Sequence, residues 1–422
     1  MDRFLYLFRS PDLRRKILMV GGLLIAFRLL AAVPIPGVDV QRLQELFSSN
    51  QLLGFLNFFS GGGLSNLSLV MLGVGPYITA TIIMQLLTII FPKFKAMYYE
   101  EGARGQAKFN QYSRILTVPL AILQGYGFLA LLARENVVVQ ATPFDAIRNV
   151  IIVTAGTMLT LWLGELISEE KIGNGISLII FAGIVGQIPA YAASAISLYT
   201  PSKLTTYVIL LAILLLLIAS VVMLNEGERR IPIAYARRVR GMKMYGGASS
   251  YLPLKVNQAG MIPLIFAISV LLFPQFIAQI IAAISPGAGA AVNGWVASFL
   301  NNHLAYGVFY FLLVVMFTYF YTAITFNPGE VAKNLQRSGG FVTGIRPGEA
   351  TETYFSRLSS KITLFGAIFL GLVAVLPLLV QWATGLEGLT ISGTALLIVV
   401  AVALETMRQV NSQLTMREYE GM

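Results

Sequence analysis

The chain has 422 residues, of which 56% are hydrophobic and only 12% are charged. Soluble domains carry about 25% charged residues, so this composition argues against a soluble fold and for a protein with several membrane spans. There is no cysteine, which excludes disulfides, zinc thiolate sites, iron–sulfur clusters and thiol nucleophiles. The formal net charge of +10 must therefore lie mainly between the spans.

Apolar runs long enough to cross a membrane, about 20 residues each, occur ten times. They are separated by charged residues, prolines or clusters of glycine. We expect spans at 17–33, 67–91, 115–133, 150–167, 175–198, 204–224, 259–284, 304–326, 362–383 and 390–408. The apolar run 208–222 shows no alternation with polar residues, which argues against transmembrane β-strands.

The distribution of Lys and Arg predicts the orientation, because cytoplasmic loops carry the excess of basic residues. With a cytoplasmic N-terminus, 25 of the 30 basic residues lie on the cytoplasmic side, four lie on the other side and one, Arg28, lies in the first span. We therefore expect both termini in the cytoplasm. A cleavable signal peptide at 1–33 is the alternative, but removing it would leave nine spans and conflict with this distribution.

Five spans in each half would give two halves of inverted topology if the chain arose by duplication. We expect one membrane domain, with an N-terminal half at 1–200 holding five spans and a C-terminal half at 201–422 holding the other five. No residue-level similarity between the halves supports the duplication.

The stretch 55–91 is too long for a single crossing and is interrupted by Gly61-Gly62-Gly63 and by Gly73-Val74-Gly75-Pro76. Between these breaks, the nine residues 64–72 would span only about 14 Å as a helix, against about 30 Å of hydrocarbon. Irregular backbone at membrane depth must be buried in protein or face a wet cavity. The sequence predicts a re-entrant segment here; a helix lying on the membrane surface is the alternative.

Two segments, 225–257 and 327–361, are long, polar and basic and are expected on the cytoplasmic side. Such loops are where a cytoplasmic partner would dock. The alternative is that they only determine topology and attract anionic lipid. Positive charge does not choose between an acidic protein and ribosomal RNA.

Acidic residues are nearly absent from the spans, where Glu165 and Glu405 lie near cytoplasmic ends. This disfavours a proton- or sodium-coupled transporter. For Arg28 we expect a structural ion pair or a reach toward the interface. The sequence has no phosphate-binding loop, His-Glu-x-x-His motif or paired carboxylates, so we expect no enzyme activity, cofactor or metal, and a driving force supplied by a partner.

Five strings together resemble the SecY family, the central channel subunits of the bacterial protein translocase. They are "FFSGGGLSNLSLVMLGVGPYITATIIMQLLT" (58–88), "WLGELISEEKIGNGISLIIFAGIV" (162–185), "GERRIPIAYARRVRG" (227–241), "LPLKVNQAGMIPLIFA" (252–267) and "FNPGEVAKNLQRSGGFVTGIRPGEATETYF" (326–355). The resemblance runs from about residue 10 to residue 410. It implies an all-α membrane protein in which ten transmembrane helices form two inverted five-helix halves around a central pore, closed by a re-entrant plug helix.

The resemblance also assigns sites, residue by residue. The plug would be the segment 59–72, including Phe59, Ser60, Gly61, Gly62, Gly63, Leu64, Ser65, Asn66, Leu67 and Ser68. The pore ring would be Ile78, Ile82, Ile176, Ile180, Ile265 and Ile398. The polar cluster of a lateral gate between the second and seventh helices would be Thr88, Gln124 and Asn257. The surface that docks a motor or ribosome would be Arg230, Arg237, Arg238, Arg240, Lys243 and Arg346.

Elementary chemistry is compatible with these roles. Isoleucines four residues apart, such as Ile78 and Ile82, share one helix face, and a narrow apolar ring can gate by dewetting. Without the resemblance, an isoleucine in a span would be expected to contact lipid. Buried polar groups bonded across helices, worth about 0.6 to 2 kcal/mol each, could hold a gate shut; the alternative is that they only join helices.

Two departures from the family pattern, at Met242 and at Gln106-Ala107, leave the exact partner contacts open. The implied partners are SecE-type and SecG-type small membrane subunits, the SecA ATPase, the ribosome, signal sequences, unfolded precursor proteins and membrane lipid, in the bacterial plasma membrane. We expect a channel that passes unfolded secretory polypeptides outward and releases transmembrane segments into lipid. An ion or metabolite transporter and a non-conducting insertase are the alternatives.

Overall fold

A computed structural model gives the structure of the chain. It describes residues 11–39, 42–43, 57, 60–134, 137–138, 142–189, 193, 196, 204–235, 238–240, 243–245, 249–384 and 393–420. The expected plug residue Phe59 and the expected docking residue Arg237 lie outside the described residues. The chain forms two compact units: unit 1 is Met1–Leu204, Ser269–Asn302 and Leu386–Met422, and unit 2 is Thr205–Ile268 and His303–Gly385.

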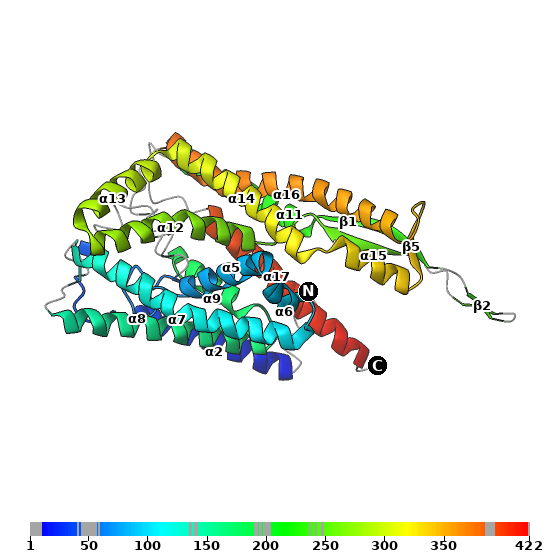
Figure 1. Cartoon of the computed structure of the whole chain (residues 1–422), viewed down its shortest axis with the longest axis horizontal. Coiled ribbons are helices and arrows are strands. Elements are labelled where there is room, and N and C mark those ends of the chain that lie inside the picture. The colour runs from blue at the N-terminus through cyan, green and yellow to red at the C-terminus, as the bar shows by residue number, and fades with distance from the viewer. Residues whose placement is uncertain are drawn as a thin grey trace. The chain divides into compact units, whose positions relative to one another are not determined.

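Unit 1 is helical. Its helices are α2 (Pro11–Ala32), α5 (Gly75–Ile90), α6 (Pro92–Tyr99), α7 (Gly102–Arg134), α8 (Pro143–Glu169), α9 (Gly175–Val185), α13 (Pro286–Asn301) and α17 (Gly393–Glu420). Helix α7 packs along α5, α6 and α8, while α9 packs against α2, α8 and α17 (Figure 1). The helix α12 (Ile262–Ile284) begins in unit 2 and continues in unit 1.

The break between α5 and α6 follows from one proline. A residue before proline is restricted to extended backbone, and Phe91, before Pro92, has φ −113° and ψ 115°. Pro92 itself is well suited to the first turn of a new helix. The two helices are therefore bent by 111° relative to each other.

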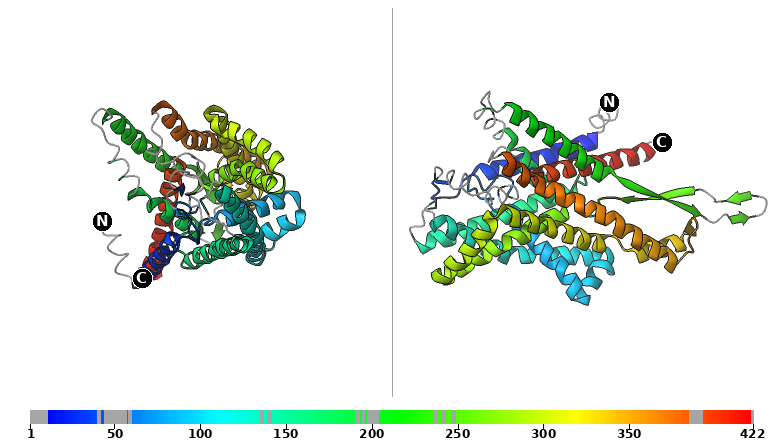
Figure 2. Two further views of the ribbon diagram at one scale, coloured as in Figure 1. Left: turned by 90° about the vertical axis from the view of Figure 1, so that its left-hand side faces the viewer. Right: turned by 90° about the horizontal axis from the view of Figure 1, so that it is seen from above.

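Unit 2 combines helices with a small sheet. Its helices are α11 (Leu204–Glu226), α14 (His303–Thr325), α15 (Pro328–Arg337) and α16 (Glu349–Thr384), and its strands are β1 (Glu228–Tyr235), β2 (Arg238–Arg240), β3 (Lys243–Tyr245), β4 (Ser249–Lys255) and β5 (Gly340–Val342). The strands β4, β1 and β5 form an antiparallel sheet in that order, with Arg230 opposite Pro253 and Ile233 opposite Val342. The hairpin of β2 and β3 extends beyond the ends of β1 and β4 (Figures 1 and 2).

The expectation of a multi-pass membrane protein is confirmed, and the spanning segments are helical. Among the described residues, six helices are long and apolar enough to cross a membrane, or seven if α5 and α6 form one broken span. Each of the ten expected ranges contains a helix, but α9, for example, has only 11 residues. Ten crossings therefore stay a prediction.

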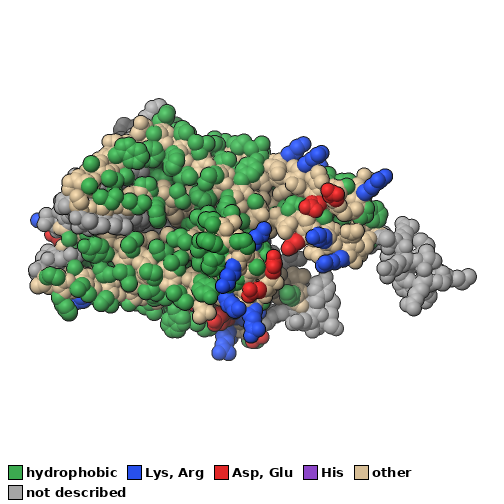
Figure 3. Space-filling view, viewed as in Figure 1, with side chains coloured by type: hydrophobic (Ala, Val, Ile, Leu, Met, Phe, Trp, Pro, Cys, Tyr) green, Lys and Arg blue, Asp and Glu red, His purple; other side chains and the backbone are tan. Residues whose placement is uncertain are grey.

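The surface of each unit fits this division between membrane and water. Figure 3 shows hydrophobic side chains over most of the visible surface, with charged side chains gathered over α6 and the start of α7 in unit 1 and around α15 in unit 2. The exposed basic residues there are Lys93, Lys95, Arg104, Lys108, Lys333, Arg337, Arg346 and Arg357. Extensive exposed apolar surface suits contact with lipid, and the clustered charges suit water.

The structure differs from two expectations in detail. Residues 60–74 form consecutive turns instead of the expected plug helix. Glycines at positive φ, Gly61 at 65° and Gly62 at 84°, prevent a regular helix at its start. The segments 225–257 and 327–361, expected as loops, contain the strands β1, β4 and β5, which the sequence analysis did not predict.

Candidate functional site

The segment 60–74 of unit 1, which we call the turn segment, is held together by local hydrogen bonds, several of them to Asn57 just before it. The N–H of Gly62 donates to the carbonyl oxygen of Asn57 at 2.9 Å, and the N–H of Ser65 donates to Asn57 Oδ1 at 2.9 Å. The N–H of Leu64 donates to Ser60 Oγ at 2.9 Å. Asn57 and Ser60 are both buried, so these side chains satisfy backbone groups that a helix would otherwise satisfy.

The turn segment is also tied to the chain that follows α2. The N–H of Ile35 donates to the carbonyl oxygen of Leu67 at 2.8 Å, and the N–H of Leu69 donates to that of Val33 at 3.0 Å. Together with the bridge between Pro34 and Ser68, these bonds form a short antiparallel pairing. The middle of the turn segment is therefore fixed by backbone hydrogen bonds.

Apolar side chains anchor the same part of the turn segment to the helices of unit 1. Leu64, Leu67 and Met71 are at most 2% exposed and belong to one buried cluster. The cluster includes Phe128, Leu129 and Leu132 of α7, Val153 of α8, and Ile35, Leu43, Val137 and Val138. We call residues 64–72 the apolar end of the turn segment.

Residues 60–63 form the other end, which we call the glycine end. It meets the backbone of α9 and the Phe27 side chain of α2. A Cβ added to Gly183 of α9 would lie 2.0 Å from the Cα of Gly61. A Cβ added to Gly61 would lie 2.4 Å from Cζ of Phe27 in α2. Real Cβ atoms do not approach this closely, so only glycine at these positions permits the contact.

Arg28 of α2 reaches the glycine end. Its Nη1 donates to the carbonyl oxygen of Gly61 at 2.9 Å. From the sequence we expect an ion pair or a reach toward the interface. Among the described residues, however, no carboxylate lies within 4.0 Å of this guanidinium. The partner of Arg28 is instead the backbone of the turn segment.

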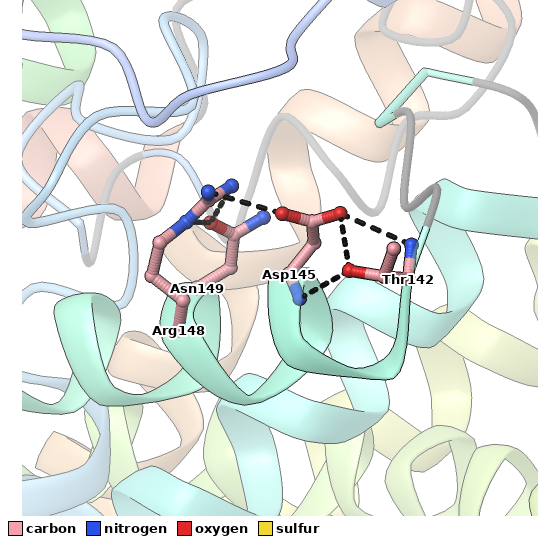
Figure 4. Close-up of polar contacts among 4 residues, drawn as sticks. All are labelled: Thr142, Asp145, Arg148 and Asn149. Atoms are coloured by element: carbon pink, nitrogen blue, oxygen red, sulfur yellow. Dashed lines mark hydrogen bonds and ion pairs between the residues drawn. The ribbon is translucent and has the colours of Figure 1, made fainter.

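The helix α8 packs on the turn segment and starts with a network of polar side chains (Figure 4). The Oγ1 of Thr142 accepts from the N–H of Asp145 at 3.3 Å, and the Asp145 carboxylate accepts from the N–H of Thr142 at 3.0 Å. Arg148 pairs with Asp145 at 3.0 Å and contacts Asn149 Oδ1. This capping box fixes the start of a helix whose Gly156 lies against the carbonyl oxygen of Leu69.

The residues of α8 and α9 that seat the turn segment were not predicted from the sequence. The capping box is visible as Thr142-Pro143-Phe144-Asp145, an acidic residue three positions after a threonine. The glycines Gly156 and Gly183 carry no local signal of their role, because only the fold brings the turn segment to them.

The six isoleucines assigned to a pore ring lie on four helices. Ile78 and Ile82 are on α5, Ile176 and Ile180 on α9, Ile398 on α17, and Ile265 on α12 within unit 2. All except Ile176 are at most 8% exposed, whereas Ile89 and Ile90, also on α5, are 59% and 66% exposed. Ile176 is half-buried and packs against Gly164 of α8. The burial separates these residues from isoleucines whose side chains face outward.

The three residues assigned to a lateral gate are buried and hydrogen-bonded within their own units. Gln124 Nε2 of α7 donates to Thr79 Oγ1 of α5 at 3.4 Å. Thr88 Oγ1 donates to the carbonyl oxygen of Gln85 within α5 at 2.7 Å. Asn257 Nδ2 donates to Asn225 Oδ1 at 2.8 Å, which joins the segment before α12 to α11. The structure therefore pairs Gln124 with Thr79 and not with Thr88.

The described residues of the expected docking surface lie in unit 2: Arg230 in the sheet, Arg346 in the turn after β5, and the others on the hairpin of β2 and β3. Buried Ile231, Ile233, Leu254, Leu335, Val342 and Phe355 form the core between this sheet, α15 and α16. Arg230 of β1 is exposed; its Nε donates to Glu228 Oε1 at 2.7 Å, and its guanidinium lies 5.0 Å from the centre of the Tyr251 ring. The Glu228 carboxylate raises the pKa of Arg230 above its usual value, so this residue stays charged.

Arg346 is exposed in the turn between β5 and α16. Its carbonyl oxygen accepts from Thr351 Oγ1 at 2.7 Å, which fixes the turn at the start of α16. Arg238, Arg240 and Lys243 lie on the hairpin of β2 and β3. Arg230 and Arg346 therefore both lie in the part of unit 2 that is formed by the sheet, α15 and α16.

Comparison with known proteins identifies relatives along the whole chain. A model of the SecY family matches residues 68–407. The protein translocase subunit SecY of Mycobacterium bovis is 42% identical over 444 residues, covering 100% of this chain and 99% of the relative. Its counterparts from Streptomyces galbus and Corynebacterium glutamicum are 42% and 40% identical, with coverage of 99% and 100% of their lengths.

Solved structures share the fold at lower identity. One is a structure of the SecY protein in which the plug domain is described as stabilising the closed state. Its TM-score is 0.67 at 20% identity, and the match covers 94% of this chain and 91% of the other. Sec61 in a canine ribosome–channel complex has a TM-score of 0.63 at 19% identity, with the same coverage. Because the sequence relatives extend over the full length, the chain belongs to the SecY family of multi-pass membrane proteins, which are translocase channel subunits and not enzymes.

Proposed function

We propose that this chain is the channel subunit of a protein translocase. It passes unfolded secretory polypeptides across the membrane and releases transmembrane segments sideways into lipid. The observation that carries this proposal is the 42% identity, over the full length, to relatives named protein translocase subunit SecY. The similar fold of a solved protein-conducting channel supports it.

The proposed plug is residues 59–72, of which residues 60–72 belong to the turn segment. Its irregular backbone is enclosed by α2, α7, α8 and α9, which supports a place inside the helical part of unit 1. Ten spans, in inverted halves at 1–200 and 201–422 around a pore, complete this architecture. The excess of basic residues between the spans supports cytoplasmic termini and a place in the bacterial plasma membrane.

The proposed pore ring is Ile78, Ile82, Ile176, Ile180, Ile265 and Ile398. Branched apolar side chains offer a passing polypeptide no strong hydrogen bond and keep a narrow constriction dry. The burial of five of the six supports an inward position over contact with lipid.

The proposed lateral gate uses Thr88, Gln124 and Asn257. Side-chain hydrogen bonds between helices in membranes are worth about 0.6 to 2 kcal/mol each, which a hydrophobic signal sequence can replace. The buried bonds from Gln124 to Thr79 and from Asn257 to Asn225 support a polar network on both sides of such a gate.

The proposed driving partners are the SecA ATPase and the ribosome, docked on the sheet of unit 2. The residues are Arg230, Arg237, Arg238, Arg240, Lys243 and Arg346. The exposure of Arg230 and Arg346 supports this role, and the canine Sec61 structure was solved in a ribosome–channel complex. SecE-type and SecG-type subunits, precursor proteins and lipid complete the proposed assembly.

The test is reconstitution of the chain with SecE-type and SecG-type subunits in vesicles supplied with SecA and ATP. We expect an unfolded secretory precursor to become protected from added protease. Movement of small solutes without any precursor would favour a metabolite transporter and contradict the proposal.

A second measurement separates a channel from a non-conducting insertase. Deleting residues 61–70 should open a measurable single-channel ion current, and replacing both Ile82 and Ile180 by glycine should raise the resting leak. A current that stays absent after the deletion would support the insertase.

A further inference from the structure

Arg28 is a charged residue in the apolar run of α2, and charged groups in such positions are rare and usually have a specific partner. Its side chain is half-buried. The carbonyl oxygen of Gly61 accepts its hydrogen bond, across 33 residues of sequence. A residue in the first span is therefore bonded to the backbone of the turn segment.

The guanidinium lies between the glycine end and the C-terminus of α9. A Cβ added to Gly186 would lie 2.3 Å from Nη2 and 2.4 Å from Cζ of Arg28. A Cβ added to Gly62 would lie 3.0 Å from Nη1. The planar group thus fits into space that exists only because both neighbours are glycines, and it joins its own helix α2 to two other parts of unit 1.

The two ends of the turn segment are held by different means. The apolar end is anchored by Leu64, Leu67 and Met71 in the buried cluster and by backbone pairing with the chain after α2. The glycine end has no apolar side chain of its own in residues 61–63. Two side chains of α2 reach it: Phe27 packs against Gly61, and Arg28 donates the hydrogen bond to the carbonyl oxygen of Gly61.

We infer that Arg28 is a latch that holds the glycine end in its seat between α2 and α9, and that breaking its bond to Gly61 releases this end while the apolar end stays packed. The inference rests on the proposed role of the turn segment as a plug. Arg28 acts as a positioning residue, since it sets how often the plug is seated. A hydrogen bond between an ionised donor and a backbone carbonyl can be broken and remade without repacking a core.

The absence of natural cysteine gives a local readout. Single cysteines replace Ser65, the half-buried residue of the apolar end whose Oγ donates to the carbonyl oxygen of Gly62 in the glycine end at 2.9 Å, or Ser68, which lies further along the apolar end and is fully buried. The rate of labelling by a water-soluble maleimide then reports the opening of each end in the full complex in vesicles. With Arg28→Gln we expect the rate at position 65 to rise at least tenfold and the rate at position 68 to change much less.

Two further variants separate a latch from a general structural role. Arg28→Lys retains a charged donor for Gly61 and should restore most of the slow labelling. Gly186→Ala keeps Arg28 but places a methyl group in the space of its guanidinium, so it should accelerate labelling at position 65 in the same way. Arg14→Gln, an exposed arginine on the same helix, and Gly22→Ala, whose Cβ would meet nothing within 4 Å, are matched controls.

The ion current distinguishes this inference from the proposed function. If deletion of 61–70 opens a current but Arg28→Gln and Gly186→Ala leave both labelling and current unchanged, the latch is wrong and the plug stands. Equal acceleration at positions 65 and 68 also contradicts the latch, because it indicates general loosening. If the deletion opens no current, the plug assignment fails and the latch fails with it.

Discussion

The turn segment of unit 1 and the sheet of unit 2 both use glycines at positive φ, but for different reasons. Gly61 has φ 65° and its Cβ position is filled by Phe27 at 2.4 Å. Gly339, before β5, has φ 71° and nothing within 4 Å of its Cβ position. Glycine therefore permits close packing in the first region and only a turn in the second.

The two regions also differ in how they are stabilised. The glycine end of the turn segment relies on backbone contacts and on the hydrogen bond from Arg28. The sheet relies on a core of apolar side chains from β1, β4, β5, α15 and α16, with charged residues such as Arg230 and Arg346 left exposed. A segment held by a few polar and backbone contacts suits reversible displacement, whereas a sheet with its own core suits a fixed docking surface.

We expect the largest difference between the two regions when the Phe355 side chain is removed. This side chain is fully buried in the core of the sheet, and Phe355→Ala should destabilise that layer by about 3 to 5 kcal/mol. Limited proteolysis should then cleave near β1 and β4 at a protease concentration that leaves the original protein intact, and SecA-driven export should fall.

Phe355→Ala should leave the resting ion leak unchanged, in contrast to its effect on export. The reason is that the turn segment belongs to unit 1 and contributes no residue to this core. Phe365→Ala, on the same helix but 62% exposed, is the matched control for export and proteolysis. A leak that rises with Phe355→Ala alone would show that the two regions are coupled.

The next effect compares the glycines directly. Gly61→Ala and Gly339→Ala both place a Cβ at positive φ, which costs about 1 to 2 kcal/mol. Only Gly61→Ala adds the overlap with Phe27, for a total of about 3 kcal/mol. We expect a raised resting leak for Gly61→Ala and none for Gly339→Ala, measured in vesicles; equal behaviour of the two variants would contradict the difference in packing.

The helical membrane architecture could be predicted because lipid imposes it on composition. Apolar runs, prolines and the distribution of basic residues predicted helices in all ten ranges, and a helix lies in each. An interruption of the apolar run between Gly63 and Gly73 could also be predicted, since nine residues are too short to cross as a helix. Its turn conformation could not, because it depends on hydrogen bonds from Asn57 and Ser60 that no residue pattern specifies.

The third strand of the sheet was missed because it is short and far in sequence from its partner. The strand β5 has three residues and pairs with β1 more than 100 positions earlier, so neither segment shows a hairpin signal. Assigning sites to Ile78, Asn257 or Arg346 depended on resemblance to a family. An isoleucine or asparagine in a span has no local feature that distinguishes a pore or gate from simple packing.

A smaller effect tests whether the sheet layer is a docking surface. Arg346→Glu should lower SecA-driven export about tenfold, equivalent to about 1.4 kcal/mol, because it reverses an exposed charge without removing a buried contact. Folding should be retained, since the bond from Thr351 is to the backbone of residue 346. Arg357→Glu, an equal change of charge on exposed α16 surface, is the control; an equal loss with both variants would indicate a general charge effect and not a specific contact.

The smallest effect concerns the cap of α15, which packs on α16 beside the sheet. The Oδ1 of Asn327 accepts from the N–H groups of Gly329 and Glu330 at 3.1 and 3.4 Å. Asn327→Ala leaves both donors without this partner and should destabilise the helix by about 1 kcal/mol. Hydrogen exchange of these two amides should accelerate about fivefold, whereas Asn327→Ser, which retains a capping oxygen, should exchange nearly as slowly as the original. Amides of the turn segment should be unaffected by either change, because its hydrogen bonds to Asn57, Ser60, Arg28 and the chain after α2 all lie within unit 1. Faster exchange in both regions would mean that the sheet layer and the turn segment open together, and the distinction between a fixed surface and a displaceable segment would then be wrong.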